Sequence, residues 1–309
     1  MEPQYISEII EHIKSRFHVD EYAEITLETN PGTVNIEKLK AFRNLGINRL
    51  SIGIQSFNNE ELKFLTRIHD SDTAVRTVLD AAESGFGNIS IDLIFNLPKQ
   101  TKKIWRSNLE QAVKLPIKHI SAYSLILERG TILNKMVLDG KVKMQSEDYD
   151  ADLYELTIAF LKDNGFVQYE VSNFAREGKE CIHNNAYWRY KDYLSFGTSA
   201  HSFVDGRRWW NYSALNLYNS AVEKKGHAVA GEEILTQTEM REEYIMLALR
   251  SKGLDLVECL KLFGSGWYNS NKVYLNQLEK DGFIILEKNL IRFTDRGYAV
   301  CDEVLSNFK

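Results

Sequence analysis

Short runs rich in β-branched residues alternate with amphipathic helical patterns from about residue 25 to residue 201, and this alternation constrains the fold most strongly. Strands that alternate with helices form a parallel sheet covered by its crossover helices. This many consecutive repeats favour a complete or partial (β/α) barrel, although periodicity alone leaves a doubly wound sheet open. The predicted strands are Ile25–Glu28, Arg49–Ile54, Asn88–Ile94, His119–Leu125, Gln168–Val171 and Tyr193–Phe196. The predicted helices are Ile36–Leu45, Thr73–Ser84, Lys102–Val113 and Glu147–Asn164.

The pattern changes after Asn211. Three helical patterns are followed by two apolar runs around Lys288 and Asn289, which predict a β-hairpin. Helices followed by a two-stranded wing resemble a winged-helix module. We therefore expect two domains, a barrel-like domain over residues 1–210 and an α+β winged-helix-like domain over residues 211–309, the latter serving as a lid or partner surface.

The balance of charge and hydropathy excludes several classes of protein. Lys and Arg number 38 against 43 Asp and Glu, a formal net charge of −5, so no basic surplus predicts a nucleic-acid partner. No segment approaches the roughly 20 apolar residues that a membrane-spanning helix needs, so we do not expect an integral membrane protein. The N-terminus lacks the basic and apolar regions of a signal peptide. These observations predict a cytoplasmic location.

The chain has 3 cysteines, Cys181, Cys259 and Cys301, and none lies close to another in sequence. Zinc and iron–sulfur sites use closely spaced thiolates, and an odd count argues against a disulfide framework. We therefore expect three free thiols, with no metal site formed by cysteines. No Gly-x-Gly-x-x-Gly follows any predicted strand, which argues against a dinucleotide-binding fold.

Polar residues occur in or just after strands that should be aliphatic. These residues are Glu28, Gln55, Asp92 and Glu170. An unpartnered buried carboxylate costs several kcal/mol, and the βα loops of a barrel form its active site at the carboxyl end of the strands. A shared pocket explains the four together better than separate local contacts do. Arg67, in the loop after the second strand, could hold a carboxylate there, although a solvated surface arginine is the alternative that the residue alone favours.

A second group of polar and aromatic residues follows the barrel pattern. Its members are His183, Tyr187 and Trp188 in the run His183–Trp188, with His201 and Arg208 further along the chain. A histidine beside aromatic and cationic side chains suits a flat anionic ligand. A hydrophobic lid is the alternative, and on residue types alone we favour the lid.

Several of these segments together resemble a known family. The segments are ITLETNPGT from Ile25, RLSIGIQSF from Arg49, DLIFNLP from Asp92, SAYSLILERGT from Ser121, YEVSNFA from Tyr169 and HNNAYW from His183. They resemble the radical S-adenosylmethionine (SAM) proteins related to oxygen-independent coproporphyrinogen III oxidase, over essentially the whole chain. The last run is more similar to the haem chaperone branch than to the oxidase.

This resemblance implies particular ligands. Glu28, Gln55, Arg67 and Asp92 would contact SAM. The carboxylates would meet its amino and ribose hydroxyl groups, Arg67 its carboxylate, and Gln55 its ribose or methionyl end. His183 would bind haem, with Tyr187 and Trp188 lining the same site and His201 and Arg208 as weaker candidates.

The chain departs from the family at the cluster. Family members carry a Cys-x3-Cys-x2-Cys loop that binds a [4Fe-4S] cluster and a Gly-Gly-Gly-Thr-Pro run, and neither is present here. We therefore expect a partial TIM-type barrel lacking its first strands, with no cluster and no assigned catalytic residue.

The resemblance leaves three functions open. The first is a haem chaperone that delivers haem to an acceptor protein. The second is an oxidase that converts porphyrinogen propionates to vinyl groups, and the third is a non-catalytic interaction module.

Overall fold

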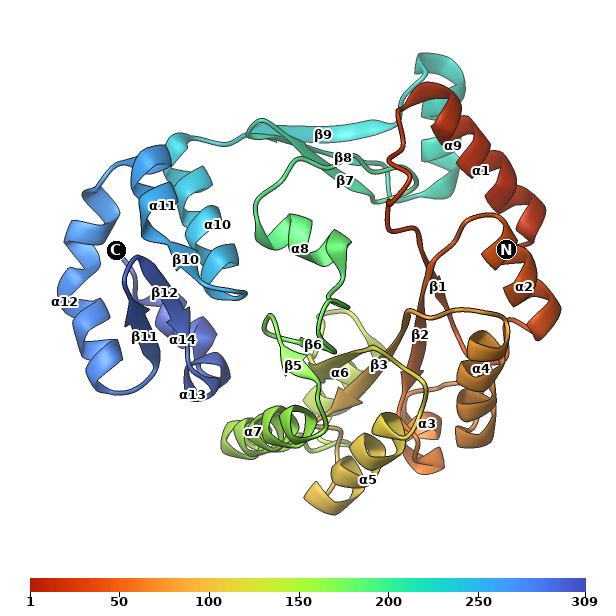
Figure 1. Cartoon of the computed structure of the whole chain (residues 1–309), viewed down its shortest axis with the longest axis horizontal. Coiled ribbons are helices and arrows are strands. Elements are labelled where there is room, and N and C mark those ends of the chain that lie inside the picture. Colours follow the sequence, from red (N-terminus) through yellow and green to blue (C-terminus); the bar gives the residue numbers. More distant parts are fainter. The chain divides into compact units, whose positions relative to one another are not determined.

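The computed structural model describes all 309 residues, Met1–Lys309. The chain divides into two compact units, Met1–Glu180 and Cys181–Lys309, each with its own core (Figure 1). Each unit is described by itself below.

The first unit is built on a six-stranded sheet in the order β1-β2-β3-β4-β6-β5. Four strands run parallel to their neighbours: β1 (Thr26–Thr29), β2 (Arg49–Gln55), β3 (Ile89–Phe95) and β4 (His119–Ser124). The sheet is then completed by an antiparallel hairpin of β6 (Asn173–Ala175) and β5 (Val167–Gln168). The predicted partial barrel is confirmed, with β1 at one edge of the sheet.

Four crossover helices cover one face of this sheet (Figure 1). They are α2 (Ile36–Asn44), α4 (Ser71–Glu83), α5 (Lys102–Val113) and α7 (Glu147–Asp163). Each begins where a side chain caps its first turn: Asn35, Asp70, Thr101 and Ser146 accept from the backbone N–H three residues on. Three shorter or peripheral helices, α1 (Pro3–Arg16), α3 (Asn59–Phe64) and α6 (Ile132–Leu138), complete the unit.

The strands are apolar on the helix-facing side and polar on the other. Leu50, Ile52 and Ile54 of β2 are fully buried, and Ile89, Ile91 and Leu93 of β3 lie on the same face under the helices. The intervening positions carry polar side chains that contact one another between strands, as in the hydrogen bond from Ser51 to Asp92. Because side chains of a strand alternate between faces, this pattern places most of the polar side chains of β2, β3 and β4 on a single surface. Ser124 at the end of β4 is an exception, since it lies on the helix-facing side and donates to Asp150 of α7 (2.8 Å).

Two predicted strands differ from the structure. The run Gln168–Val171 is not one parallel strand, because the chain turns back after Gln168 and β6 begins at Asn173. Glu170 favours that turn, since its buried carboxylate accepts the backbone N–H of Ser172 (3.2 Å). The run Tyr193–Phe196 forms only an isolated bridge, between Tyr193 and Phe203. The parallel pattern therefore ends at β4.

The second unit contains two three-stranded antiparallel sheets. The first sheet follows the short helix α8 (Ile182–Trp188) and has the strand order β7-β8-β9. Its strands are β7 (His201–Val204), β8 (Arg207–Asn211) and β9 (Val229–Ile234). Helix α9 (Leu215–Lys225) lies between β8 and β9 in sequence. The second has the order β10-β12-β11 and consists of β10 (Leu254–Asp255), β11 (Ile284–Glu287) and β12 (Leu290–Phe293).

Helices around the second sheet form the winged-helix-like arrangement that the sequence predicted. They are α10 (Gln237–Leu249), α11 (Leu256–Phe263), α12 (Gly266–Lys280), α13 (Asp295–Ala299) and α14 (Cys301–Ser306). The hairpin of β11 and β12 is the wing. The predicted domain boundary between residues 210 and 211 falls within β8, whereas the compact units divide after Glu180. The division into two domains at residues 210 and 211 therefore stays a prediction.

None of the helices combines the length and the apolar character that crossing a bilayer would require.

Candidate SAM and haem sites

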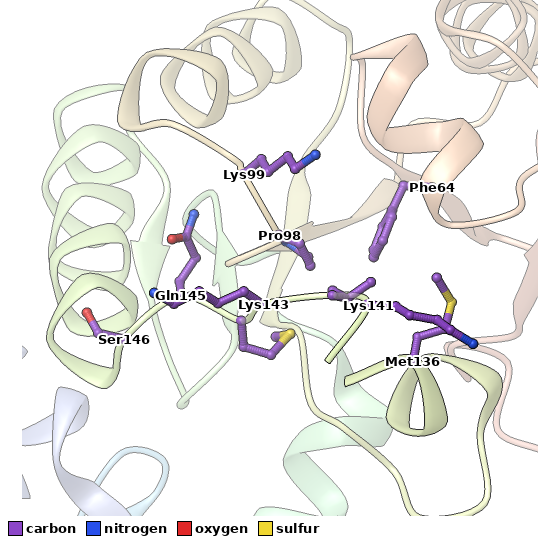
Figure 2. Close-up of a pocket in the computed structure, with 10 residues that line it drawn as sticks. Phe64, Pro98, Lys99, Met136, Lys141, Lys143, Gln145 and Ser146 are labelled. Carbon is purple, nitrogen blue, oxygen red and sulfur yellow. The ribbon is translucent and has the colours of Figure 1, made fainter. Parts of the chain in front are cut away.

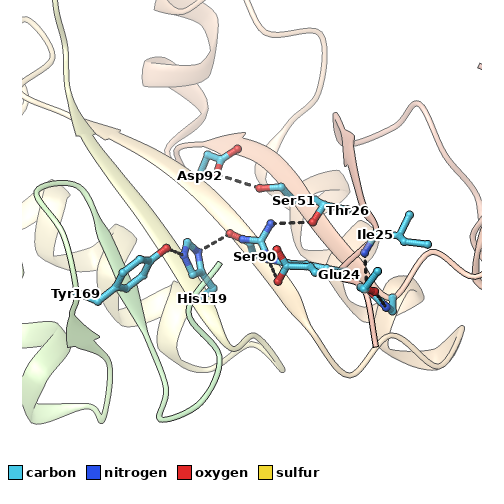
Figure 3. A network of polar contacts seen from close by, with 11 residues as sticks. Glu24, Ile25, Thr26, Ser51, Ser90, Asp92, His119 and Tyr169 are labelled. Carbon is cyan, nitrogen blue, oxygen red and sulfur yellow. Dashed lines mark hydrogen bonds and ion pairs between the residues drawn. The ribbon is translucent and has the colours of Figure 1, made fainter. Parts of the chain in front are cut away.

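The polar surface of the sheet has a densely bonded layer near the amino ends of the strands (Figure 3). Arg49 is 4% exposed and lies 3.9 Å from a carboxylate oxygen of Glu24. His119 is fully buried and hydrogen-bonds through one ring nitrogen to Ser90 (2.7 Å) and through the other to the Tyr169 hydroxyl (2.8 Å). Burial lowers the pKa of His119 to about 3, so the imidazole is neutral and acts as a structural hydrogen-bonding group.

Asp92 lies further toward the carboxyl end of β3, where the surface opens to solvent. The pKa of Asp92 is raised to about 6, chiefly by burial and also by the nearby carboxylate of Glu28, against the opposing effect of hydrogen bonds from Ser121 and Ser51. Glu28 itself is exposed on β1. A part-buried carboxylate that forms no direct ion pair is suited to accept hydrogen bonds from a ligand's hydroxyl or ammonium groups.

Gln55 ends β2 in an unusual backbone conformation. The register of β2 with β3 shifts between Ile52 and Gln55, and Gln55 has a positive φ of 71°, a region that non-glycine residues seldom adopt. Bulges of this kind occur next to functional sites, where they redirect a side chain. The Gln55 side chain lies against Gly53, since a Cβ on Gly53 would stand 2.9 Å from its amide nitrogen.

Two more side chains meet at the same place. A Cβ on Gly53 would also stand 3.0 Å from Oδ1 of Asn30, the residue that follows β1. Arg67 donates from Nη1 to that same oxygen (3.3 Å). The loop carrying Arg67 is tied back to β2 because Nε2 of the buried His69 bonds to the carbonyl oxygen of Ile54 (3.1 Å). The structure thus brings Gln55 and Arg67 together around Gly53. The predicted ligand pocket that includes Glu28 and Asp92 stays a prediction.

A buried carboxylate holds the loops that form this edge. Glu61 on α3 is 8% exposed and accepts hydrogen bonds from Ser56 (2.5 Å), Asn108 (2.9 Å) and Gln100 (2.9 Å). These donors come from the loop after β2, from α5 and from the loop after β3. Glu61 therefore fixes two βα loops to each other beside Gln55.

Sequence reasoning missed Asn30, Gly53 and Glu61. The asparagine and glycine carry no charge that looks misplaced in a strand, and Glu61 resembles an ordinary acidic residue in a first helical turn. The alternation of Arg49 and Ser51 with Leu50, Ile52 and Ile54 could have revealed the polar face. Glu170, which the sequence did single out, lies in the β5–β6 turn, where burial raises its pKa to about 7.

The predicted haem-binding residues lie on α8 in the second unit. His183 is exposed, and its ring meets the ring of Tyr187 edge to face, with centroids 4.7 Å apart. Tyr187 contacts Tyr193 in the same way at 4.5 Å, and Trp188 is half-buried at the end of the helix. Residues four apart share one face of a helix, so His183 and Tyr187 present an imidazole backed by an aromatic wall.

His201 and Arg208 have other partners. His201 stacks on Trp210, with ring centroids 5.9 Å apart. Arg208 forms ion pairs with Glu233 (2.8 Å) and Glu243 (2.6 Å), so its charge is already compensated. Their role as weaker haem-binding candidates stays a prediction.

The three cysteines are all buried free thiols in the second unit, and no group of three or more His, Cys, Asp or Glu residues is placed to hold a metal ion. These residues do not fit an iron–sulfur cluster. The residues around Gly53, in contrast, offer a guanidinium and two amide groups, which are hydrogen-bonding groups that fit the carboxylate and hydroxyl groups of SAM.

The chain is similar to several known proteins. Residues 1–112 match the model of the radical SAM superfamily. The chain is 32% identical to the haem chaperone HemW of Bacillus subtilis, covering 93% of this chain and 76% of that protein. It is also 32% identical to HemW of Lactococcus lactis, over 99% and 80% of the two chains. A mitochondrial radical SAM domain-containing protein 1 of Danio rerio is 33% identical, over 98% and 71%.

Among solved structures, coproporphyrinogen III oxidase HemN of Escherichia coli superimposes with a TM-score of 0.83 at 24% identity, covering 99% of this chain and 74% of that one. At that level of identity the likeness shows the fold alone.

Proposed function

This chain belongs to the radical SAM family, in the branch that contains the HemW haem chaperones, and on that premise we propose that it binds haem and delivers it to an acceptor protein. The similarity to HemW proteins over nearly the whole chain carries this proposal. The exposed imidazole of His183, backed by Tyr187, supports it, because haem iron takes a histidine nitrogen as an axial ligand.

We further propose that SAM binds around Gly53. Arg67 would bind the carboxylate of SAM, Glu28 and Asp92 its ammonium and ribose hydroxyl groups, and Gln55 its ribose or methionyl end. The gathering of Asn30, Gln55 and Arg67 around Gly53 supports this assignment. Radical SAM family members combine SAM with a [4Fe-4S] cluster, and no step of that chemistry is assigned to residues of this chain.

The oxidase remains a weaker candidate. Only the shared fold of HemN favours it, and a fold can carry different activities. A cytoplasmic location and a haem-accepting partner protein stay part of the proposal.

Haem titration tests the proposal directly. We expect wild type to develop a Soret band at a ratio of one haem per chain, and His183→Ala to lose that band or shift it. The matched control is His12→Ala, on the exposed surface of α1 in the first unit. Identical spectra for wild type and His183→Ala would remove His183 from the proposal.

A further inference from the structure

The helix that carries His183 ends in an unusual way. None of the residues of α8 is buried, so its own side chains anchor it weakly. After its last turn the N–H of Tyr190 donates to the carbonyl oxygen of Tyr187 (2.9 Å). The N–H of Lys191 donates to the carbonyl oxygen of Ala186 (3.0 Å). This pair of bonds is a Schellman motif, which requires a left-handed residue just after the helix.

Glycine usually occupies that left-handed position, because a side chain there costs free energy. In α8 the position is taken by Tyr190, with a φ of 54°. A residue that its own backbone disfavours is retained where its side chain has another role. The side chain of Tyr190 therefore does something that glycine could not do.

The hydroxyl of Tyr190 joins the end of α8 to two other elements. It donates to a carboxylate oxygen of Glu243 on α10 (3.2 Å), and the same oxygen accepts from Nη2 of Arg208 on β8 (2.6 Å). Burial and the nearby Glu243 carboxylate raise the pKa of Tyr190, so the hydroxyl keeps its proton and remains a donor. The end of α8 is thus attached to both α10 and β8.

The ring of Tyr190 packs against two buried aromatic residues. Its centroid lies 4.9 Å from that of Phe203 on β7 and 6.3 Å from that of Tyr244 on α10. Both separations are within the range of favourable aromatic pairs. Ring and hydroxyl therefore attach this side chain to neighbouring positions of α10, Glu243 and Tyr244.

The same aromatic cluster extends to the predicted haem-binding face. Tyr193 exchanges two backbone hydrogen bonds with Phe203 (2.8 and 3.0 Å). The rings of Tyr193 and Tyr187 lie 4.5 Å apart between centroids, and Tyr187 meets the ring of His183 at 4.7 Å. Packed side chains therefore connect Tyr190 with His183.

We propose that Tyr190 and Glu243 are positioning residues, which attach α8 to α10 so that the imidazole of His183 has one fixed orientation toward its ligand. Neither residue is assigned a contact with that ligand. Haem as the ligand of His183 rests on the function proposed above, whereas the attachment of α8 rests on the contacts just described. A side chain that is fixed before binding loses less conformational entropy on binding.

Hydrogen exchange of the ligand-free protein tests the attachment of α8. We expect the amides of α8 to exchange about 10-fold faster in Tyr190→Phe, which removes only a hydroxyl bonded to a charged acceptor. Unchanged exchange would overturn the proposal.

Tyr149→Phe is the matched control for this measurement and should leave α8 unchanged. Its hydroxyl also makes one hydrogen bond, to the carbonyl oxygen of Gln100 in the first unit (3.1 Å). The same oxygen accepts from Gln145 (3.1 Å), which Figure 2 shows in the wall of a cavity of that unit.

Haem titration tests whether the attachment acts on the ligand site. We expect Tyr190→Phe and Glu243→Ala each to weaken haem binding by about 5-fold. Glu243→Gln should stay close to wild type, because its amide oxygen still accepts from the hydroxyl. Glu242→Ala is the control, since this neighbouring glutamate is more exposed and is not bonded to Tyr190.

A double variant separates positioning from a general loss of stability. Tyr190→Phe should have no further effect on haem affinity in a His183→Ala background, because the positioned imidazole is already absent. Where haem binding depends on His183, an equal effect of Tyr190→Phe in both backgrounds would overturn the proposal. If haem binding does not depend on His183 and α8 still exchanges faster in Tyr190→Phe, the haem site fails while the attachment of α8 is supported.

Discussion

At the scale of single residues, the absence of a side chain at Gly53 is what lets Gln55 and Asn30 approach each other. The atoms that a Cβ would meet are the ends of flexible polar side chains rather than backbone. The fold can therefore accommodate a methyl group there by moving those ends, whereas the pocket cannot keep its arrangement.

We expect Gly53→Ala to weaken SAM binding by about 10-fold while costing less than about 1 kcal/mol of stability, because only the ligand-facing amide groups must move. Isothermal titration with SAM and urea unfolding measure the two effects. Gly87→Ala is the control, since a Cβ on Gly87 meets nothing within 4 Å. Equal SAM affinity in Gly53→Ala and wild type would contradict the assignment of this pocket.

The raised pKa of Asp92 predicts that the free energy of unfolding depends on pH. Its folded pKa of about 6 lies above the ordinary value of 3.8, so the folded state holds the proton more tightly than the unfolded state does. The ionised carboxylate therefore destabilises the fold, by at most about 3 kcal/mol at about 1.4 kcal/mol per pKa unit. This cost grows as pH rises from about 4 to about 6 and is constant above that.

We expect Asp92→Asn to be more stable than wild type at pH 8 and equal to it near pH 4, as measured by urea unfolding across the range. The same substitution should weaken SAM binding at pH 8, since an amide no longer offers a charged acceptor. A stability difference that does not change with pH would show that Asp92 is not buried as described.

At the scale of elements, the helices and parallel strands could be predicted well, and the last strands could not. α5 was predicted at its observed bounds, because Thr101 and the apolar face of the helix define it locally. The turn at Glu170 depends instead on a carboxylate buried by tertiary packing, which no local pattern shows. Sequence patterns singled out Glu28, Arg67 and Asp92 because a charge stands out in or beside an apolar strand, whereas Asn30 and Gly53 carry no such signal.

Glu61 links elements that are far apart in sequence, so its removal should be costly. Glu61→Ala would leave the buried donors of Ser56, Asn108 and Gln100 without their acceptor. We expect a loss of about 2–4 kcal/mol in the free energy of unfolding. Urea unfolding of Glu60→Ala, on the same helix with an exposed ion pair to Lys63, is the control and should change by less than about 0.5 kcal/mol. Similar losses in both variants would contradict the described network.

At the scale of the whole molecule, the positions of the cysteines predict that this chain does not bind an iron–sulfur cluster. They lie at positions 181, 259 and 301, all buried in the second unit, and burial raises the pKa of Cys301 to about 12, which keeps its thiol protonated. Thiolates are the form that binds iron. We expect iron and acid-labile sulfide to stay at background after anaerobic reconstitution of this chain, with a holo radical SAM protein as the positive control. Stoichiometric iron and sulfide would contradict this expectation.

The two-sided character of β3 has a further consequence, for how the chain folds. A slip of one residue in the pairing of β3 would turn Asp92 under the crossover helices and expose Ile91 and Leu93 on the polar side. Such a misaligned sheet would bury a charge and expose hydrophobic area at the same time, and both changes raise its free energy. The residues that form the ligand surface therefore also select the correct strand alignment while the sheet assembles.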